Sequence, residues 1–334
     1  MKIGYICNQG TCVSGASNGI RMQALIWCDE LIKQGHEVVL INSWGTYDWT
    51  TFDLVHAFGF ADSISFVQEM KKRNVPVVCS PIIDTVQSKS LYKLATLLGS
   101  ETLRINSPGY YLRKKEKYID LFFARSKFEA SYLNECFDIP LDKIAIIPLS
   151  YKQYDKELLC PNKENFCFHV SSLTQGRKNV MRLIKAAIKY KFNLVLAGST
   201  NPQSAFKPLK KLIDENENIT CLGFISDEQL EDLYSKAKVF ALPSLNEGVG
   251  LVALDAAAHG CDIVITNVGG PKEYYPDEMA LKVNPYSIDE IGQAVVKLMS
   301  ESRQPELSMY IKANYKVEKC VGKLIDEYNK IVKR

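Results

Sequence analysis

Long apolar runs are missing from this sequence, and their absence bounds the kind of protein it can be. No stretch approaches the roughly 18 uninterrupted apolar residues that a membrane-spanning helix needs. Residues 1–10 do not combine a charged leader with a long apolar run, so they lack the pattern of a secretory signal. Without export, the ten cysteines are expected to stay reduced. These absences predict a cytoplasmic, soluble protein.

An excess of charge of either sign is also absent. The 334 residues include 41 Lys plus Arg against 38 Asp plus Glu, so no strong electrostatic field favours nucleic acid as a partner. The sequence has no D-x-D pair of carboxylates, no Cys/His cluster with zinc spacing and no Walker loop. We therefore expect neither a metal site nor a nucleic-acid surface.

What the sequence does contain is an alternation of short apolar runs with segments of helical periodicity. Continuous apolar strands that are each followed by a helix predict parallel sheets covered on both faces. The runs lie at residues 2–7, 37–41, 54–57 and 75–79, and the pattern restarts at 166–170, 194–197, 219–222, 239–242 and 262–266. The length suits two domains of this α/β kind.

The domain boundary is expected in the polar stretch 151–165, which carries many charges and little periodicity. We predict one Rossmann-like domain over 1–155 and a second over 156–315. The last segment, 316–334, is predicted to be a helix that packs back on the first domain. The carboxyl ends of the strands in two such sheets would face an interdomain cleft, where ligands of these sheets bind.

The strongest local pattern runs from Pro243 to Gly260, where a strand ends, an acidic glycine-bearing loop follows and a small-residue helix begins. Gly248 and Gly250 allow the backbone to approach a ligand closely, and the helix start offers free N–H groups to a diphosphate. Glu247 and Asp255 could accept hydrogen bonds from sugar or ribose hydroxyls. An alternative is a packing element whose acids complement the helix N-terminus.

This stretch resembles the E-x7-E signature of family 4 (group 1) glycosyltransferases, and its surroundings match the same family. Residues 223–230, 269–273 and 283–285 resemble further landmarks of that family. The resemblance covers the chain from about Phe166 onward and is weaker before it. It implies the GT-B architecture and hexosyl or other glycosyl transfer with retention. It further implies that the donor is a nucleotide-diphosphate sugar, that the acceptor is a glycan, a lipid-linked or another hydroxyl, and that no cofactor or metal takes part.

Site residues follow from the resemblance position by position. It implies that Glu247 contacts the donor sugar and the reacting centre, that Lys178 and Arg177 bind the diphosphate, and that Asp255 binds the ribose. The remaining donor-binding positions are Gly19, Ser172, Gly198, Ile225, Val249, Gly250, Leu251 and Val252. Without the resemblance, Arg177 and Lys178 could be a solvated pair at a helix N-terminus, and Gly19, after Asn18, could equally be an ordinary turn.

Two positions depart from the family pattern. Ser172 replaces an arginine, for which Arg177 could substitute. No histidine follows the strand at residues 75–79, where many members have one near the donor sugar. His56 or Asp84 could stand in, although a structural role for His56 is favoured. These changes leave open a catalytically weak GT-B subunit that binds a partner or glycan, or another GT-B chemistry such as sugar-nucleotide epimerisation.

A basic aromatic stretch, residues 110–118, has no place in this donor site. Arg113, Lys114, Lys115 and Lys117 could contact anionic lipid headgroups, which would place the protein at the inner face of the membrane. A solvated helix face explains the stretch equally well.

Overall fold

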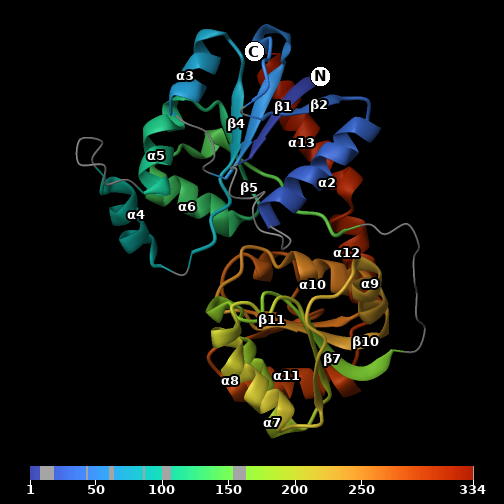
Figure 1. The fold of residues 1–334 in the computed structure, drawn as a ribbon. Helices are drawn as coiled ribbons and strands as arrows, with labels where there is room; N and C mark the ends of the chain where they lie inside the picture. The colour runs from blue at the N-terminus through green and yellow to red at the C-terminus, as the bar shows by residue number, and fades with distance from the viewer. Residues whose placement is uncertain are drawn as a thin grey trace. The chain divides into compact units, whose positions relative to one another are not determined.

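The computed structural model describes residues 1–7, 19–42, 44–59, 64–85, 87–99, 107–152 and 163–333. The chain divides into two compact units, and Figure 1 colours them along the sequence. Unit 1 comprises Met1–Leu149 and Val317–Arg334, and unit 2 comprises Ser150–Lys316. The first boundary lies at the start of the polar stretch in which the sequence predicts a linker.

Unit 1 is built on a parallel six-stranded sheet with the order β2-β1-β3-β4-β5-β6. Most residues of its central strands are apolar, because helices cover both faces of the sheet. The strands are β1 (Lys2–Cys7), β2 (Glu37–Leu40), β3 (Leu54–Phe58), β4 (Val77–Ser80), β5 (Leu121–Ala124) and β6 (Ile144–Ile146). The helices are α2 (Gly19–Lys33), α3 (Ile64–Lys72), α4 (Lys89–Leu97), α5 (Pro108–Lys115), α6 (Lys127–Phe137) and α13 (Val317–Val332), with short 3-10 turns η1 (Trp49–Thr51), η2 (Glu116–Tyr118) and η3 (Leu141–Lys143).

Unit 2 repeats this architecture with the parallel order β12-β11-β10-β7-β8-β9. Its strands are β7 (Glu164–Val170), β8 (Leu194–Ala197), β9 (Ile219–Cys221), β10 (Ala237–Leu242), β11 (Asp262–Thr266) and β12 (Leu281–Val283). Its helices are α7 (Val180–Tyr190), α8 (Gln203–Asp214), α9 (Asp227–Lys236), α10 (Leu251–Ala258), α11 (Ile288–Ser300) and α12 (Glu306–Asn314), with the turns η4 (Gly176–Lys178) and η5 (Pro271–Glu273). The predicted α/β class with two parallel sheets is therefore confirmed.

The helix α13 is the last element of the chain, yet it belongs to unit 1. Figure 1 shows it, in red, beside the blue helix α2. Its Tyr328 is fully buried and hydrogen-bonds with Nδ1 of His56 on β3 at 2.6 Å, while Nε2 of His56 hydrogen-bonds with Ser80 on β4 at 2.8 Å. Burial keeps the pKa of His56 well below its usual value. These contacts fix α13 against the first sheet.

The basic stretch 110–118 folds as the end of α5 followed by η2, and its four cations differ in exposure: Lys117 is exposed, whereas Arg113 and Lys114 are half-buried. Lys115 is fully buried. Arg113 donates from Nη1 to Asp138 at 2.7 Å and from Nη2 to the carbonyl of Cys136. The prediction that four cations of this stretch contact lipid headgroups is therefore wrong for Lys115, because its side chain is buried inside the unit and cannot reach a surface. Among the described residues, no helix is long and apolar enough to cross a membrane.

Candidate active site

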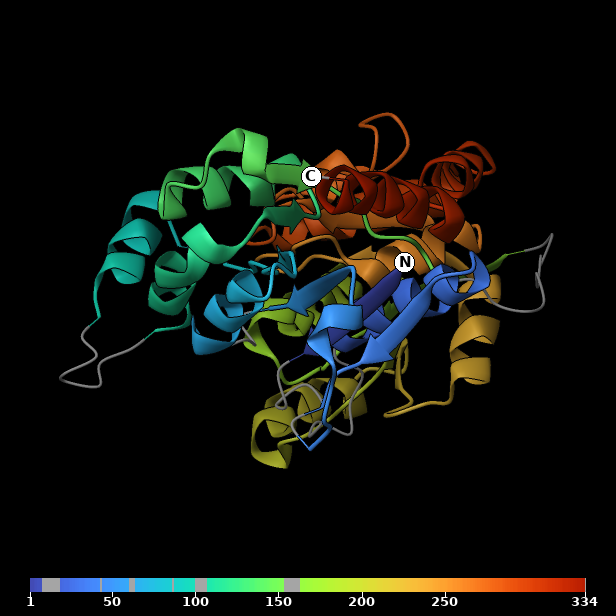
Figure 2. The ribbon, with the colours of Figure 1, turned by 90° about the horizontal axis from the view of Figure 1, so that it is seen from above.

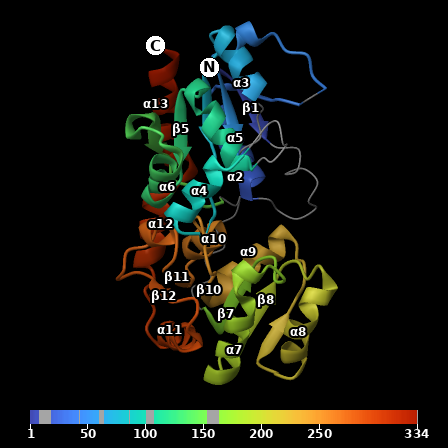
Figure 3. The same ribbon diagram turned by 90° about the vertical axis from the view of Figure 1, so that its left-hand side faces the viewer.

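The loops that follow β7, β10 and β11 lie next to one another at one edge of the second sheet. Figure 3 shows these three strands side by side, and β10 pairs with both of its neighbours. From β7 the chain continues to β8 on one side, whereas from β10 it continues to β11 on the other. The β7–β10 junction is therefore the point at which the strand order reverses. In open parallel sheets, ligands bind at the carboxyl ends of the strands at such a point.

Lys178 and Glu247 form an ion pair at this junction, although they are 69 positions apart in the sequence. The Nζ atom of Lys178 lies 3.0 Å from each carboxylate oxygen of Glu247. The two side chains are only 12% and 10% exposed. Nη1 of Arg177 lies 3.8 Å from the same carboxylate. Two cations thus face one acid, and the surplus positive charge suits an anionic ligand.

Backbone contacts hold the loop that carries Glu247. Glu247 pairs with Gly269 in a parallel bridge, and its carbonyl accepts a hydrogen bond from the N–H of Gly270 at 3.2 Å. Gly269 adopts φ +95°, and a Cβ there would lie 2.1 Å from the Glu247 carbonyl oxygen, so only glycine fits. On the other side, the N–H of Leu245 donates to the carbonyl of Arg177 at 2.8 Å. The two loops are therefore joined by backbone as well as by side chains.

Asn179 supports the same junction from beneath. It adopts a left-handed conformation, φ +61°, at the start of α7 and is buried. Its Nδ2 donates to the carbonyls of Pro243 at 2.8 Å and Pro285 at 2.6 Å. Asparagine tolerates this backbone region better than most residues, and it supplies the two donors needed here. Its neighbour Lys178 is thereby fixed in position.

The helix α10 begins directly after the Glu247 loop. Gly250 is its N-cap residue and has φ +81°, and Val249 before it is buried. Leu251 and Val252 form the first turn and are half-buried. A glycine N-cap has no side chain to bond the first N–H groups, and the helix dipole places positive potential there. These four positions have the local geometry that the predicted phosphate contact needs.

Asp255 lies on the following turn of α10. One of its carboxylate oxygens accepts a hydrogen bond from the N–H of Lys152 at 2.7 Å. Burial raises the pKa of Asp255 to about 7, even though the hydrogen bond from Lys152 opposes that rise. The carboxyl group of Asp255 therefore already accepts a hydrogen bond from the backbone at the start of unit 2, and its predicted contact with a ribose would be made in addition to that bond.

His169 is a site residue that sequence reasoning missed. It is fully buried at the end of β7, where Nδ1 donates to the carbonyl of Ala241 at 2.7 Å and Nε2 accepts from the hydroxyl of Ser171 at 2.7 Å. Burial lowers the pKa of His169 to about 4, and the charge of Lys178 acts in the same direction. The neutral ring fixes the ends of β7 and β10. A histidine inside an otherwise apolar strand was the signal available.

Gly198 and Ile225 follow the strands β8 and β9 on the other side of β7. Gly198 has φ +119°, and a Cβ there would lie 1.8 Å from the Ser171 carbonyl oxygen, so this position also requires glycine. Ile225 is half-buried beside Phe224, which is 75% exposed. Ser172 is half-buried in the loop after β7. All three therefore lie at the carboxyl edge of the second sheet, as predicted, while their contacts with a donor stay predictions.

The candidates in unit 1 have different outcomes. Gly19 is the first residue of α2, and Asn18 lies outside the described residues. His56 has both ring nitrogens bonded inside the unit, so it is a structural residue and not a substitute for the missing histidine. Asp84 accepts a hydrogen bond from Nη2 of the buried Arg125 at 2.9 Å and is one-third exposed. Of the two, only Asp84 keeps access to solvent.

No group of three or more His, Cys, Asp or Glu side chains could hold a metal ion in the part of the chain that the structure describes. Metal independence itself stays a prediction.

Comparison with known proteins places this site in a family. The sequence profile of the family described as "Glycosyl transferases group 1" matches residues 150–317, half of the chain and all of unit 2. An uncharacterized glycosyltransferase of Methanocaldococcus jannaschii is 25% identical over 68% of this chain and 63% of its own length. The serotype-specific mannosyltransferase WbdA of Escherichia coli is 25% identical over 75% of this chain but only 33% of its own length.

A sucrose-phosphate synthase from Thermosynechococcus elongatus has the same overall fold. It superposes with a TM-score of 0.77 over 99% of both chains, at 17% sequence identity. The likeness extends through both sheets, so the two-unit chain has the GT-B fold that the resemblance implied. The profile match and the fold lead to one conclusion: this chain belongs to the group 1 glycosyl transferase family.

Proposed function

We propose that this chain transfers a sugar from a nucleotide-diphosphate sugar to a hydroxyl acceptor with retention of configuration. The acceptor is a glycan, a lipid-linked sugar or another hydroxyl compound of cell-surface polysaccharide or glycoconjugate synthesis. We place the reaction in the cytoplasm, at the inner face of a membrane. The observation that carries the proposal is the buried Lys178–Glu247 pair at the strand-order reversal of the second sheet, beside the N-terminus of α10.

The pair suggests how the leaving group is stabilised. As the bond from sugar to phosphate breaks, negative charge accumulates on the diphosphate. Lys178, Arg177 and the first N–H groups of α10 are arranged to receive this charge, so no metal ion is required. Glu247 lies 3.0 Å from Lys178 and is thereby held where the anomeric centre has to be. The acceptor hydroxyl then attacks from the face that the diphosphate leaves and passes its proton to the departing phosphate oxygen, so the glycosidic bond forms with retained configuration.

The other predicted contacts orient the donor. Asp255 binds the ribose and Ile225 the base, so that the diphosphate between them is delivered to Lys178. Val249 and the backbone of α10 contact the distal phosphate and the sugar. Most of the rate enhancement then comes from positioning and from fixed charges, because no side chain here forms a covalent intermediate in this scheme.

The test is incubation of the purified protein with a panel of nucleotide-diphosphate sugars, read out as release of nucleoside diphosphate. Mannose donors come first in the panel because WbdA is named as a mannosyltransferase. Release that disappears in Lys178→Met supports the proposal. Binding of nucleoside diphosphates without turnover of any donor or acceptor would instead favour a catalytically weak subunit. Conversion of the donor sugar without release of diphosphate would favour epimerisation.

A further inference from the structure

We infer that Asp84 of unit 1 binds the sugar acceptor through adjacent hydroxyl groups and selects uncharged acceptors over phosphorylated ones. The inference rests on the proposed function and names the class of acceptor that the proposal leaves open. Asp84 lies in the loop that runs from β4 to α4 (Figure 1), four residues after the last residue of β4. Ligands of open parallel sheets bind at this carboxyl edge.

The loop after β4 contains a residue in a strained conformation. Ile82 adopts φ +59°, which lies in the left-handed region. Among the described non-glycine residues with positive φ, Ile82 is the one with a branched Cβ, and such residues rarely occupy that region. Strain of this kind persists only where the surrounding structure enforces it, and it is concentrated at functional sites. The loop is therefore held in one shape against its local preference.

A buried ion pair between β5 and the first turn of α6 enforces this shape. The N–H of Ile83 donates to Oε1 of Glu129 at 2.5 Å, and the carbonyl of Ile83 accepts from Nη2 of Arg125 at 3.2 Å. Arg125 also donates to both carboxylate oxygens of Glu129, from Nε and from Nη2, at 2.9 Å each. The side chains of Arg125 and Glu129 are only 8% and 2% exposed. Both backbone groups of the residue after Ile82 are thereby bound to a fixed pair of charges.

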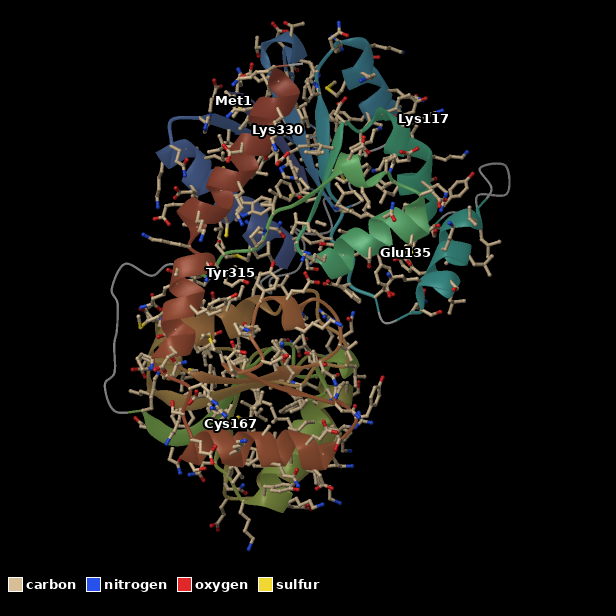
Figure 4. The ribbon with its side chains drawn as sticks, turned by 180° about the vertical axis from the view of Figure 1, so that it is seen from behind. Met1, Lys117, Glu135, Cys167, Tyr315 and Lys330 are labelled. Atoms are coloured by element: carbon tan, nitrogen blue, oxygen red, sulfur yellow. The ribbon has the colours of Figure 1, made fainter. Side chains whose placement is uncertain are left out.

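The helix α6 gives this pair a rigid support. It lies with α4 and α5 on one side of unit 1 (Figures 1 and 2), and Figure 4 labels Glu135 on it. Ser126 caps the helix, because its hydroxyl accepts the N–H of Glu129 at 3.1 Å, and both residues are buried. The carboxylate that anchors the loop therefore belongs to the first turn of a capped helix.

Asp84 is the exposed member of the same network. Its Oδ1 accepts a hydrogen bond from Nη2 of Arg125 at 2.9 Å, and its side chain is 34% exposed. Burial disfavours the charged form of Arg125, but Glu129 and Asp84 hold the pKa of the guanidinium above its usual value. One buried cation thus serves two acids. The three side chains carry one excess negative charge, and it lies on the acid that solvent reaches.

A carboxylate held in this way suits an uncharged sugar. An ionised carboxylate only accepts hydrogen bonds, and its two oxygens match two hydroxyls on neighbouring carbons of a pyranose ring. A phosphorylated sugar would bring further negative charge to a network that already has an excess of one. A divalent cation would meet the Arg125 guanidinium, which bonds to the same carboxylate. The chemistry that fits Asp84 is therefore a neutral ring with adjacent hydroxyl groups.

The experiment measures sugar binding by saturation-transfer NMR titration without a donor. The probes are the methyl glycosides of mannose, glucose and galactose, and the 6-phosphates of the same three sugars. The proteins are wild type, Asp84→Asn and the control Asp120→Asn. Asp120 is 27% exposed, pairs with Lys71 at 3.2 Å and accepts from the N–H of Val77 at the start of β4. It is a similar ion-paired aspartate at the opposite edge of the same sheet.

Wild type and control should bind at least one glycoside about fivefold or more tightly than its 6-phosphate, the effect of one added charge at about 4 Å in water. Asp84→Asn should bind that glycoside about tenfold more weakly, because charge-assisted hydrogen bonds are lost, and should lose the preference. Circular dichroism checks that the proteins are folded. If the asparagine variant is not folded, Asp84→Ser takes its place with the same expected result.

Kinetics test the same contact during transfer. With a donor that the protein hydrolyses, Asp84→Asn should raise the KM for the acceptor about tenfold, whereas the KM for the donor and hydrolysis without acceptor stay near the wild-type values. A purely structural role for Asp84 would not separate the two KM values.

Four results would overturn the inference: equal glycoside binding by wild type and the folded Asp84 variant, a preference for the 6-phosphates, an equal loss in the control, or no glycoside binding by the wild type. Donor hydrolysis that proceeds while Asp84→Asn leaves glycoside binding unchanged refutes this inference alone. Glycoside binding that depends on Asp84, without hydrolysis or transfer of any donor, refutes the proposed function alone.

Discussion

Replacing Lys178 with methionine should destabilise unit 2 and weaken binding of a nucleoside diphosphate at the same time. Methionine keeps most of the buried aliphatic length but removes the charge that Glu247 contacts at 3.0 Å. The variant leaves a carboxylate that is about nine-tenths buried with only Arg177, at 3.8 Å, as a neighbouring cation. An uncompensated buried charge is costly, so the loss should appear even without ligand.

The magnitude follows from the burial of the pair. Removing one partner of a buried ion pair typically costs about 3–5 kcal/mol of unfolding free energy. Arg177 is 40% exposed and can move toward Glu247, so we expect the lower end, about 3 kcal/mol. The double variant Lys178→Met/Glu247→Gln removes both charges. Its loss should be smaller than the sum of the two single losses by about 2 kcal/mol, since residues in contact are not additive.

Denaturant unfolding can assign the loss to the correct unit. All three tryptophans of the chain, Trp27, Trp44 and Trp49, are in unit 1, so tryptophan fluorescence reports that unit, whereas far-UV circular dichroism reports both. We expect the circular dichroism transition to shift. Calorimetric titration should show nucleoside diphosphate binding weakened about tenfold or more in Lys178→Met. Binding should strengthen in Glu247→Gln, because the diphosphate no longer competes for the lysine. Loss of less than about 1 kcal/mol, or strictly additive losses, would refute the reasoning.

Three further outcomes are expected. Glu247→Gln should lower kcat under saturating donor, whereas Asp255→Asn should mainly raise the KM for the donor, because ribose contacts change little between the ground state and the transition state. The reverse pattern would mean that the ribose lies near Glu247 and the sugar near Asp255. Transfer should persist in excess EDTA; loss that Mg²⁺ or Mn²⁺ restores would reveal a metal requirement. The pKa of His169 is about 4 in the folded protein and about 6.5 in the unfolded chain, so between these pH values the histidine takes up a proton mainly when it is unfolded. As the pH falls from 6.5 to about 4, the unfolding free energy of the wild type should therefore drop by about 3 kcal/mol more than that of His169→Asn, since Asp255 titrates equally in both proteins. Parallel pH profiles in denaturant unfolding would contradict this.

The sequence predicted the sheets and the acidic loop for a physical reason. Strands covered on both faces are mostly apolar, and runs such as residues 239–242 show this directly. A loop that carries Glu247 just before two glycines, Gly248 and Gly250, at the end of such a run could be located in the same way. The helix that follows begins at Leu251 and ends at Ala258, within the stretch from Pro243 to Gly260 that carries the pattern.

The features that were missed depend on contacts between distant segments. Nothing local in the sequence pairs Lys178 with Glu247, because the contact exists only once β7 and β10 are neighbours. Lys115 looked like a member of a cationic surface patch, although packing in unit 1 buries it.

The place of α13 has a consequence for the order in which the protein can fold during synthesis. The sheet of unit 1 is complete by residue 146, but the helix that buries His56 and covers Tyr5 starts only at Val317. At about 5–20 residues per second, a ribosome needs roughly 8–34 s to translate the intervening residues. During that interval unit 2, which is continuous in sequence, can fold first, while the first sheet waits with an apolar face uncovered. A chain shortened before residue 317 would keep that face exposed, which makes it a natural substrate for chaperones.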